Sequence, residues 1–204
     1  MSEGLCRVKM CGLSRSEDIE AVNALLPDYI GFVFWEKSRR FVSDEKAAGL
    51  KKQLDGRIQA VGVFLDDAID HIADLAENGV IDLIQLHGHE DEDYIKLLRQ
   101  RTKLPVIQAF VVKDESAAKL AENSTADYIL LDAGYGTGQT FDWELLSDIK
   151  RPYFLAGGLD PDNVAGAISR LKPFAVDVSS GIETDGQKDP VKMKAFMSNI
   201  TKES

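Results

Sequence analysis

Two short apolar segments of this sequence each end in a reactive side chain. Cys11 closes the run that begins at Val8, and Asp132 closes the run that begins at Tyr128. A thiol and a carboxyl at the ends of two parallel strands can act as a base and an acid on opposite sides of one substrate. The pair therefore predicts a proton-transfer site that needs no cofactor.

Lys9 lies two residues before Cys11 and therefore on the same face of the predicted strand. Free cysteine has a pKa near ~8.5, and a useful base requires appreciable thiolate. Because a neighbouring ammonium group favours the thiolate, we expect Lys9 to lower the pKa of Cys11. Cys6 is instead interpreted as a small buried apolar side chain.

The hydrophobic pattern predicts the elements that position these side chains. Apolar runs rich in Val, Ile, Leu and Phe alternate with charged, amphipathic segments typical of helices. Because the runs are apolar on both faces, we expect parallel strands covered by helices. Eight such units without a linker favour an α/β fold, a single-domain (β/α)8 TIM barrel over residues 1–204, rather than an open doubly wound sheet. The predicted strands lie near 5–10, 28–34, 58–64, 81–86, 105–110, 127–132, 152–156 and 174–178.

Three helix starts carry recognisable capping signals. Ser14 with Glu17 predicts a capping box that opens a helix extending through Leu26. Asp160-Pro161 and Asp189-Pro190 each predict a capping residue followed by proline at the first helical position. The first of these two helices is expected to span 160–171.

The composition limits the possible partners and location. The 204 residues include 24 basic and 34 acidic side chains, a net charge of −10. This balance argues against nucleic acid, which binds basic surfaces. Cys6 and Cys11 point to opposite faces of one strand, which disfavours a disulfide between them. Without a signal-peptide run or an apolar stretch near the ~20 residues of a membrane helix, we expect a cytoplasmic protein with no membrane partner.

Small residues follow the last two predicted strands. Gly157 and Gly158 follow strand seven, and Ser179-Ser180-Gly181 follows strand eight. Loops at these two places in a barrel commonly present backbone N–H groups to a phosphate. Either loop alone is equally well explained as a tight turn, but the two together favour phosphate binding.

Polar side chains also follow strands two and four. The basic segment 37–40 contains Arg39 and Arg40. A charge run is usually solvated surface, but here it is a candidate anion clamp, because arginine can hold a carboxylate with two parallel hydrogen bonds. His87, which follows Gln85, is interpreted as facing the substrate. The histidines and cysteines never cluster with metal-ligand spacing, so no metal site is expected.

The segment after Asp132 is rich in glycine over residues 133–140. Such a sequence disfavours an immediate helix and predicts a mobile loop that could cover a ligand. A carboxylate at this position could simply order the loop. Its place at the base of a predicted lid favours a functional role instead.

Taken together, these segments resemble the phosphoribosylanthranilate isomerase family of tryptophan biosynthesis. The similarity runs along the whole chain, and the order of the motifs makes it specific. It is carried by Val8-Lys9-Met10-Cys11-Gly12, Gly31-Phe32-Val33-Phe34, Ser38-Arg39-Arg40-Phe41-Val42-Ser43, Val61-Gly62-Val63-Phe64, Ile84-Gln85-Leu86-His87-Gly88, Leu131-Asp132, Gly136-Thr137-Gly138, Phe141-Asp142-Trp143, Leu155-Ala156-Gly157-Gly158-Leu159 and Val176-Asp177-Val178-Ser179-Ser180-Gly181-Ile182-Glu183.

The resemblance implies a (β/α)8 barrel that performs an Amadori rearrangement on a phosphorylated aminoaldose, without metal or cofactor. It implies that Asp132 is the general acid and Cys11 the general base. It also implies that Arg40 binds the anthranilate carboxylate, although Arg39 stands where the family often has Pro or Lys and either arginine could face the ligand. The residues expected to contact substrate are Arg40, Gln85, His87, Gly157, Gly158, Asp177, Ser180 and Gly181.

Two other classes of function fit parts of the same pattern. A related phosphate-binding barrel, such as an aldose–ketose isomerase or an indole-forming synthase, would share the loops, but its catalytic lysine pattern is missing. A non-catalytic barrel that binds a phosphorylated metabolite is disfavoured because both Cys11 and Asp132 are present. The sequence leaves the oligomeric state open between a monomer and a homodimer.

Overall fold

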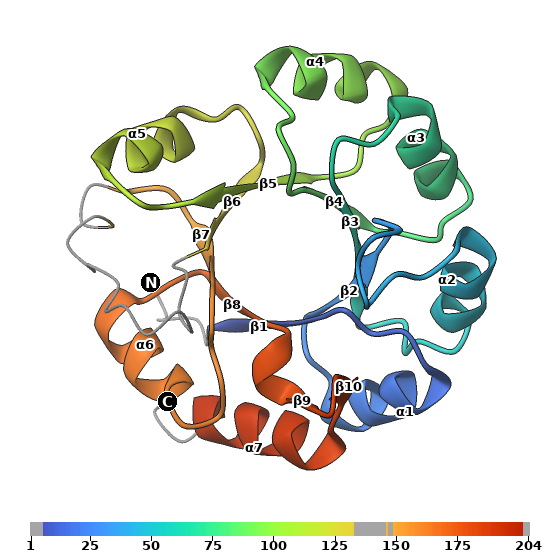
Figure 1. Ribbon diagram of the computed structural model, residues 1–204, viewed down its shortest axis with the longest axis vertical. Coiled ribbons are helices and arrows are strands. Elements are labelled where there is room, and N and C mark those ends of the chain that lie inside the picture. The colour runs from blue at the N-terminus through green and yellow to red at the C-terminus, as the bar shows by residue number, and fades with distance from the viewer. Residues whose placement is uncertain (1–5, 133–145, 147–148, 202–204) are drawn as a thin grey trace.

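Eight parallel strands close into a barrel, as the sequence predicts. The computed structural model describes residues 6–132, 146 and 149–201. Each strand pairs with its neighbours in chain order, and β1 also pairs with β8, which closes the ring in Figure 1. The strands are β1 (Arg7–Cys11), β2 (Tyr29–Val33), β3 (Gln59–Phe64), β4 (Leu83–Leu86), β5 (Val106–Val111), β6 (Tyr128–Asp132), β7 (Tyr153–Ala156) and β8 (Ala175–Val178).

Helices surround the barrel on its outer side (Figure 1). The connection between β6 and β7 lies largely outside the described residues, and with it the glycine-rich segment 133–140 that was predicted to cover a ligand. No helix in the described ranges is long and apolar enough to span a membrane. The helices of the described part are α1 (Ser16–Leu25), α2 (Asp44–Lys51), α3 (Ile69–Glu77), α4 (Glu92–Arg101), α5 (Glu115–Asn123), α6 (Val164–Leu171) and α7 (Pro190–Thr201).

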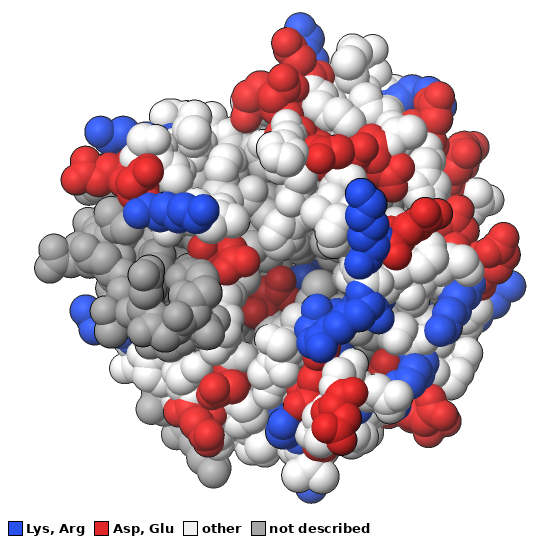
Figure 2. Space-filling view, in the orientation of Figure 1, with Lys and Arg blue, Asp and Glu red and all other residues white. Residues whose placement is uncertain are grey.

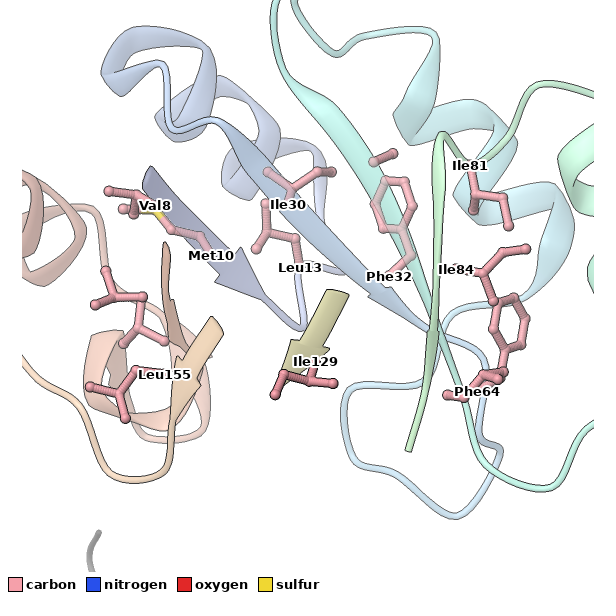
Figure 3. Close-up of a cluster of buried hydrophobic side chains, with 14 of the residues drawn as sticks. Val8, Met10, Leu13, Ile30, Phe32, Phe64, Ile81, Ile84, Ile129 and Leu155 are labelled. Carbon is pink, nitrogen blue, oxygen red and sulfur yellow. The ribbon is translucent and has the colours of Figure 1, made fainter. Parts of the chain in front are cut away.

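The outer layer of the core lies between the strands and the helices. Successive side chains of a strand point to opposite faces, so Val8 and Met10 of β1 face outwards. Figure 3 shows Met10 beside Ile30 and Leu13 in this layer. All four side chains are almost completely buried, and they belong to the cluster that includes the apolar face of α1. Burial of this layer attaches the helices to the barrel.

A second apolar cluster fills the inside of the barrel. Its members come mostly from the first three residues of their strands, so they occupy the end at which the strands begin. The opposite end, where the strands finish, is thereby left for polar side chains. The buried members of this inner cluster are Tyr29, Val61, Leu83, Ile107, Leu130, Phe154, Ala156 and Ala175.

The capping box predicted from Ser14 and Glu17 is wrong by one residue. Helix α1 begins at Ser16 after Arg15, and the carboxylate of Asp18 accepts the backbone N–H groups of Ser14 and Arg15 at 2.9 and 3.0 Å. Asp18 also receives the guanidinium of Arg15, which fixes the carboxylate in this position. The buried aspartate therefore accepts the N–H of Ser14, which the predicted capping box assigned to Glu17.

The two Asp-Pro signals have different outcomes. Pro190 is the first residue of α7, and Asp189 accepts the N–H of Val191 at 2.8 Å, so this helix start is confirmed. The helix expected from residue 160 begins only at Val164. The carboxylate of Asp160 accepts the N–H groups of residues 162 and 163, which form a turn before the helix. The helix therefore starts after this turn.

A short hairpin between β8 and α7 was not predicted. Strands β9 (Glu183–Thr184) and β10 (Gln187–Lys188) are antiparallel and joined by Asp185 and Gly186. Both turn residues have positive φ values, 52° and 78°. An Asp-Gly pair is the preferred sequence for such a two-residue turn, so the signal was present in the chain.

Candidate active site

The carboxyl ends of the strands surround a cavity of about 350 Å³. Figure 2 shows a hollow at the centre of the molecule, with acidic atoms in it and basic side chains beside it. Two larger surface hollows, of about 690 and 510 Å³, contain neither Cys11 nor Asp132. Nine of the ten predicted site residues line the central cavity: Cys11, Arg40, Gln85, His87, Asp132, Gly157, Gly158, Asp177 and Ser180.

Cys11 ends β1 with its side chain inside the barrel. Val33 and Val63 pack against it, and its exposed fraction is 8 %. A Cβ atom on the neighbouring Gly31 would lie 2.6 Å from Sγ, so the absence of a side chain there makes room for the thiol. Cys11 thus lies in a tight apolar site that opens only towards the cavity.

Burial raises the pKa of the Cys11 thiol. Lys9 and Lys188 oppose this rise, whereas Asp177 adds to it. Lys9 does favour the thiolate, as expected. The net pKa of Cys11 is nevertheless raised, so the expectation of a lowered pKa is wrong. Removal of water from around the thiol outweighs the nearby positive charge.

Lys9 and Asp177 form a buried ion pair across β1 and β8. Lys9 Nζ donates to Asp177 Oδ2 at 2.9 Å, and Lys9 is completely buried. The second oxygen, Asp177 Oδ1, and Gln85 Oε1 are buried without a hydrogen-bond partner among the described residues. Both residues line the cavity, so its wall carries two acceptors that a ligand's hydroxyl groups could satisfy.

His87 lies beside Gln85, and the charge of Asp132 influences its pKa. Gln85 Nε2 is 3.0 Å from His87 Nδ1, which fixes the orientation of the imidazole ring. Burial lowers the pKa of His87, and the charge of Asp132 opposes that effect. His87 is therefore neutral near pH 7. Asp132 itself ends β6 and is half-buried at the cavity.

Arg40 rather than Arg39 reaches the cavity. Arg40 Nε and Nη2 donate to Glu183 Oε1 and Oε2 at 2.6 and 2.9 Å, and the Arg40 side chain crosses Gly12. Arg39 also donates to Glu183, but its side chain is 59 % exposed and does not line the cavity. Sequence reasoning missed Glu183, because it pairs with arginines more than 140 positions away.

The loops after β7 and β8 are packed directly on each other. A Cβ atom on Gly181 would lie 1.9 Å from the carbonyl oxygen of Leu159. Gly157 and Gly158 adopt positive φ values of 98° and 66°, which favour glycine. Gly181 does not line the cavity itself, but its lack of a side chain allows Ser180 to approach the Gly157-Gly158 turn.

Several residues of the cavity wall are not among the ten predicted site residues. Trp35 and Ser38 follow β2, and Ser179 donates a hydrogen bond to the carbonyl of Cys11 at 3.0 Å. Within the described ranges there is no group of three or more His, Cys, Asp or Glu side chains that could hold a metal ion.

A closed eight-stranded barrel with a polar cavity at the carboxyl ends of its strands defines a barrel enzyme of the (β/α)8 class. The model of the N-(5'-phosphoribosyl)anthranilate isomerase family matches residues 8–199. The chain belongs to this family.

Individual relatives cover nearly the whole chain. An N-(5'-phosphoribosyl)anthranilate isomerase of Endomicrobium trichonymphae is 48 % identical over 186 residues, which are 90 % of this chain and 92 % of the relative. The crystal structure of the phosphoribosyl anthranilate isomerase from Thermotoga maritima is 38 % identical, with a TM-score of 0.88 over 97 % of this chain and 99 % of that chain. A further isomerase structure, 37 % identical with a TM-score of 0.86 and the same coverage, is a complex with reduced 1-(o-carboxyphenylamino)-1-deoxyribulose 5-phosphate.

Proposed function

We propose that this chain converts N-(5'-phosphoribosyl)anthranilate, an aminoaldose, into 1-(2-carboxyphenylamino)-1-deoxyribulose 5-phosphate, the third step of tryptophan synthesis from chorismate. Membership of the family supports the overall reaction. The observation that carries the chemistry is that Cys11 and Asp132 line the same cavity from β1 and β6. These strands lie three positions apart around the closed ring, so their ends can flank one substrate.

The reaction needs one proton donated and one removed. In the proposed mechanism Asp132 protonates the furanose ring oxygen, and the bond from that oxygen to C1 breaks to give a Schiff base. The thiolate of Cys11 then takes the proton from C2, and the resulting enolamine ketonises to the product. Both steps are general acid–base catalysis by positioned side chains.

The remaining residues of the cavity fit the other groups of this substrate. The glycine turn at 157–158, with Ser180, offers small residues and backbone N–H groups to the phosphate. Gln85 and Asp177 each bring an acceptor oxygen that has no hydrogen-bond partner in the described part of the chain and that suits a sugar hydroxyl. His87, being neutral, can orient the sugar without adding charge next to Asp132.

Arg40 is proposed to bind the anthranilate carboxylate. It lines the cavity, whereas Arg39 does not. Two of its N–H groups are directed at Glu183, which holds the guanidinium plane in a fixed orientation before substrate arrives. A guanidinium held in this way still has donors for a second carboxylate, because it carries five N–H groups.

The test follows the fluorescence of freshly prepared phosphoribosylanthranilate after addition of the purified protein. Wild type should remove the signal rapidly and form the aminoketose. Cys11→Ala and Asp132→Asn should each lower turnover by at least ~100-fold, the usual lower effect of a positioned acid or base. Wild-type rates in either variant would refute its assigned role. No turnover by wild type above the spontaneous rate would refute the proposed function.

A further inference from the structure

The β9–β10 hairpin places two buried charges behind Arg40 and Ser179, which line the cavity, and the proposed reaction gives the second charge, Lys188, no role. Glu183 and Lys188 face each other in the hairpin register, and their side chains are only 4 % and 2 % exposed. Lys188 Nζ donates to Glu183 Oε1 at 2.7 Å and to the Ser179 carbonyl at 2.9 Å. Burying an ammonium group is costly, so a buried lysine beside a reactive site calls for a functional explanation.

Ser179 contacts both Lys188 and the backbone of Cys11. Ser179 Oγ is 3.3 Å from Lys188 Nζ and donates to the Cys11 carbonyl at 3.0 Å. Ser179 thus ties the last strand of the barrel to the end of β1 at the point where Lys188 is anchored. The ammonium group is thereby held at a fixed place near the thiol.

The other charges that face Cys11 largely cancel. Lys9 and Asp177 form a pair with no net charge on the β1–β8 side. Across the cavity, burial lowers the pKa of His87, which favours its uncharged form. These groups give no surplus of positive charge beside the thiol.

The hairpin side does carry such a surplus. The carboxylate of Glu183 receives Lys188, Arg40 and Arg39, so three cations share one anion and the group has a net charge of +2. Lys188 is the most buried of these cations and interacts electrostatically with Cys11. An anion in the cavity would offset the surplus, and the thiolate of Cys11 is one such anion.

We propose that Lys188 is a positioning residue of the active site, which holds a buried positive charge beside Cys11 and so favours the ionised thiol. Glu183 keeps both Lys188 and Arg40 in place. The inference deepens the proposed function, because a cysteine base must lose its proton before it can accept one from C2. In agreement, Lys188 counteracts the burial that raises the pKa of Cys11.

The test measures the ionisation of Cys11 without any substrate. In a Cys6→Ala background, Cys11 is the one remaining cysteine of the sequence, so alkylation by iodoacetamide reports on it alone. We expect Lys188→Met to slow this alkylation about tenfold at pH 7 and to shift its pH profile upwards by about one unit. Lys188→Arg, which keeps the charge, should restore most of the rate.

A matched control removes a neighbouring charge that does not approach the thiol. Lys192 donates to the backbone carbonyl of Glu183 at 2.6 Å, and Lys192→Met should leave the alkylation profile unchanged. If Lys188→Met fails to fold by circular dichroism, Lys188→Gln, which retains a donor for Ser179, takes its place with the same expected loss. An unshifted profile in the Lys188 variant, or an equal shift in Lys192→Met, would overturn the proposal.

Kinetics then separate this inference from the proposed function. If both hold, the pH profile of kcat/KM moves upwards with the alkylation profile in Lys188→Met. A shifted alkylation profile with an unshifted kcat/KM profile would support the role of Lys188 in ionising the thiol while contradicting the role of Cys11 as base. An unshifted alkylation profile overturns the role of Lys188, whatever the kinetics of the wild type.

Discussion

Lys9 forms a buried ion pair with Asp177, which lines the active-site cavity. It is completely buried inside the barrel and donates to Asp177 at 2.9 Å, so two opposite charges are removed from water together. The pair lies between the apolar cluster at one end of the barrel and the cavity at the other. A buried pair of this kind is most costly when one partner is removed, because the other charge stays behind.

Lys9→Met should lower the free energy of unfolding by about 3 kcal/mol, since it leaves the Asp177 carboxylate buried without a cation. Urea unfolding followed by circular dichroism measures the change. The control is Lys51→Met, which breaks a partly exposed ion pair with Asp82 and should cost less than about 1 kcal/mol. Equal losses in the two variants would contradict the special role of the buried pair.

At the scale of elements, the loops after β7 and β8 act as one unit. Their backbones come very close at Gly181, which has no Cβ atom to meet the carbonyl of Leu159. The contact holds Ser180 next to the Gly157-Gly158 turn, and these are the residues proposed to bind phosphate. A side chain at position 181 would force the two loops apart.

Gly181→Ala should therefore lower kcat/KM by between about 10-fold and 100-fold, as expected for a displacement of about 1 Å in a binding site. Steady-state kinetics with phosphoribosylanthranilate measure the loss. Gly166→Ala is the matched control, because a Cβ atom at this position of α6 meets nothing within 4 Å. It should keep wild-type kinetics and gain up to about 1 kcal/mol of stability. Normal kinetics in Gly181→Ala would refute the proposed coupling of the loops.

The strands could be predicted from the sequence because each is a short apolar run that is buried on both faces. All eight predicted strands are present, with bounds that differ from the prediction by at most two residues. The strand ends then placed nine of the ten predicted site residues around one cavity. A closed parallel barrel makes this possible, since it brings all the strand ends together whatever their distance in the chain.

The sequence could not predict contacts that depend on side chains far apart in the chain. Nothing local to Arg40 indicates that Glu183 will hold it, and nothing local to Cys11 shows that burial will outweigh Lys9. The start of α1 was misplaced because two neighbouring acidic residues, at positions 17 and 18, both fit the capping pattern, and only the structure shows Asp18 accepting the N–H groups of Ser14 and Arg15. The β9–β10 hairpin was different, because its Asp-Gly signal was available and was overlooked.

At the scale of the whole molecule, two ionic groups join separate parts of the barrel surface. His71 of α3 lies 2.9 Å from Asp67 and 3.1 Å from Asp44, at the start of α2. Glu183 joins the hairpin to the arginines after β2. One group loses its charge as the pH rises and the other as the pH falls, so together they define a range of pH in which the fold is most stable.

We expect stability to be greatest between about pH 4.5 and 6.5. Burial alone would lower the pKa of His71, but hydrogen bonds to Asp44 and Asp67 raise it above its usual 6.5. Its contribution is therefore complete below pH 6.5 and is lost as the pH rises through the raised value. Burial alone would raise the pKa of Glu183, but Arg40 and Lys188 lower it below 4.5, so its contribution is complete above pH 4.5 and is lost in acid.

Urea unfolding midpoints measured from pH 3 to pH 9 test this expectation. His71→Asn should flatten the decline on the alkaline side, and Glu183→Gln should make the decline on the acid side shallower. Each variant serves as the control for the other, because its effect should be confined to one side of the curve. A variant that lowers the midpoint equally at every pH would contradict the titration of that side chain.

The pairing of β1 with β8 joins Lys9 to Asp177, which the ribosome adds 168 residues later. During translation, β1 therefore has an unpaired edge and an unmatched ammonium group until nearly all the other strands have been made. A nascent chain that stops before β8 is left with two open sheet edges, which are prone to pair with other chains and aggregate. Rapid completion of the last segment, or a chaperone that shields β1 until then, would protect the newly made polypeptide.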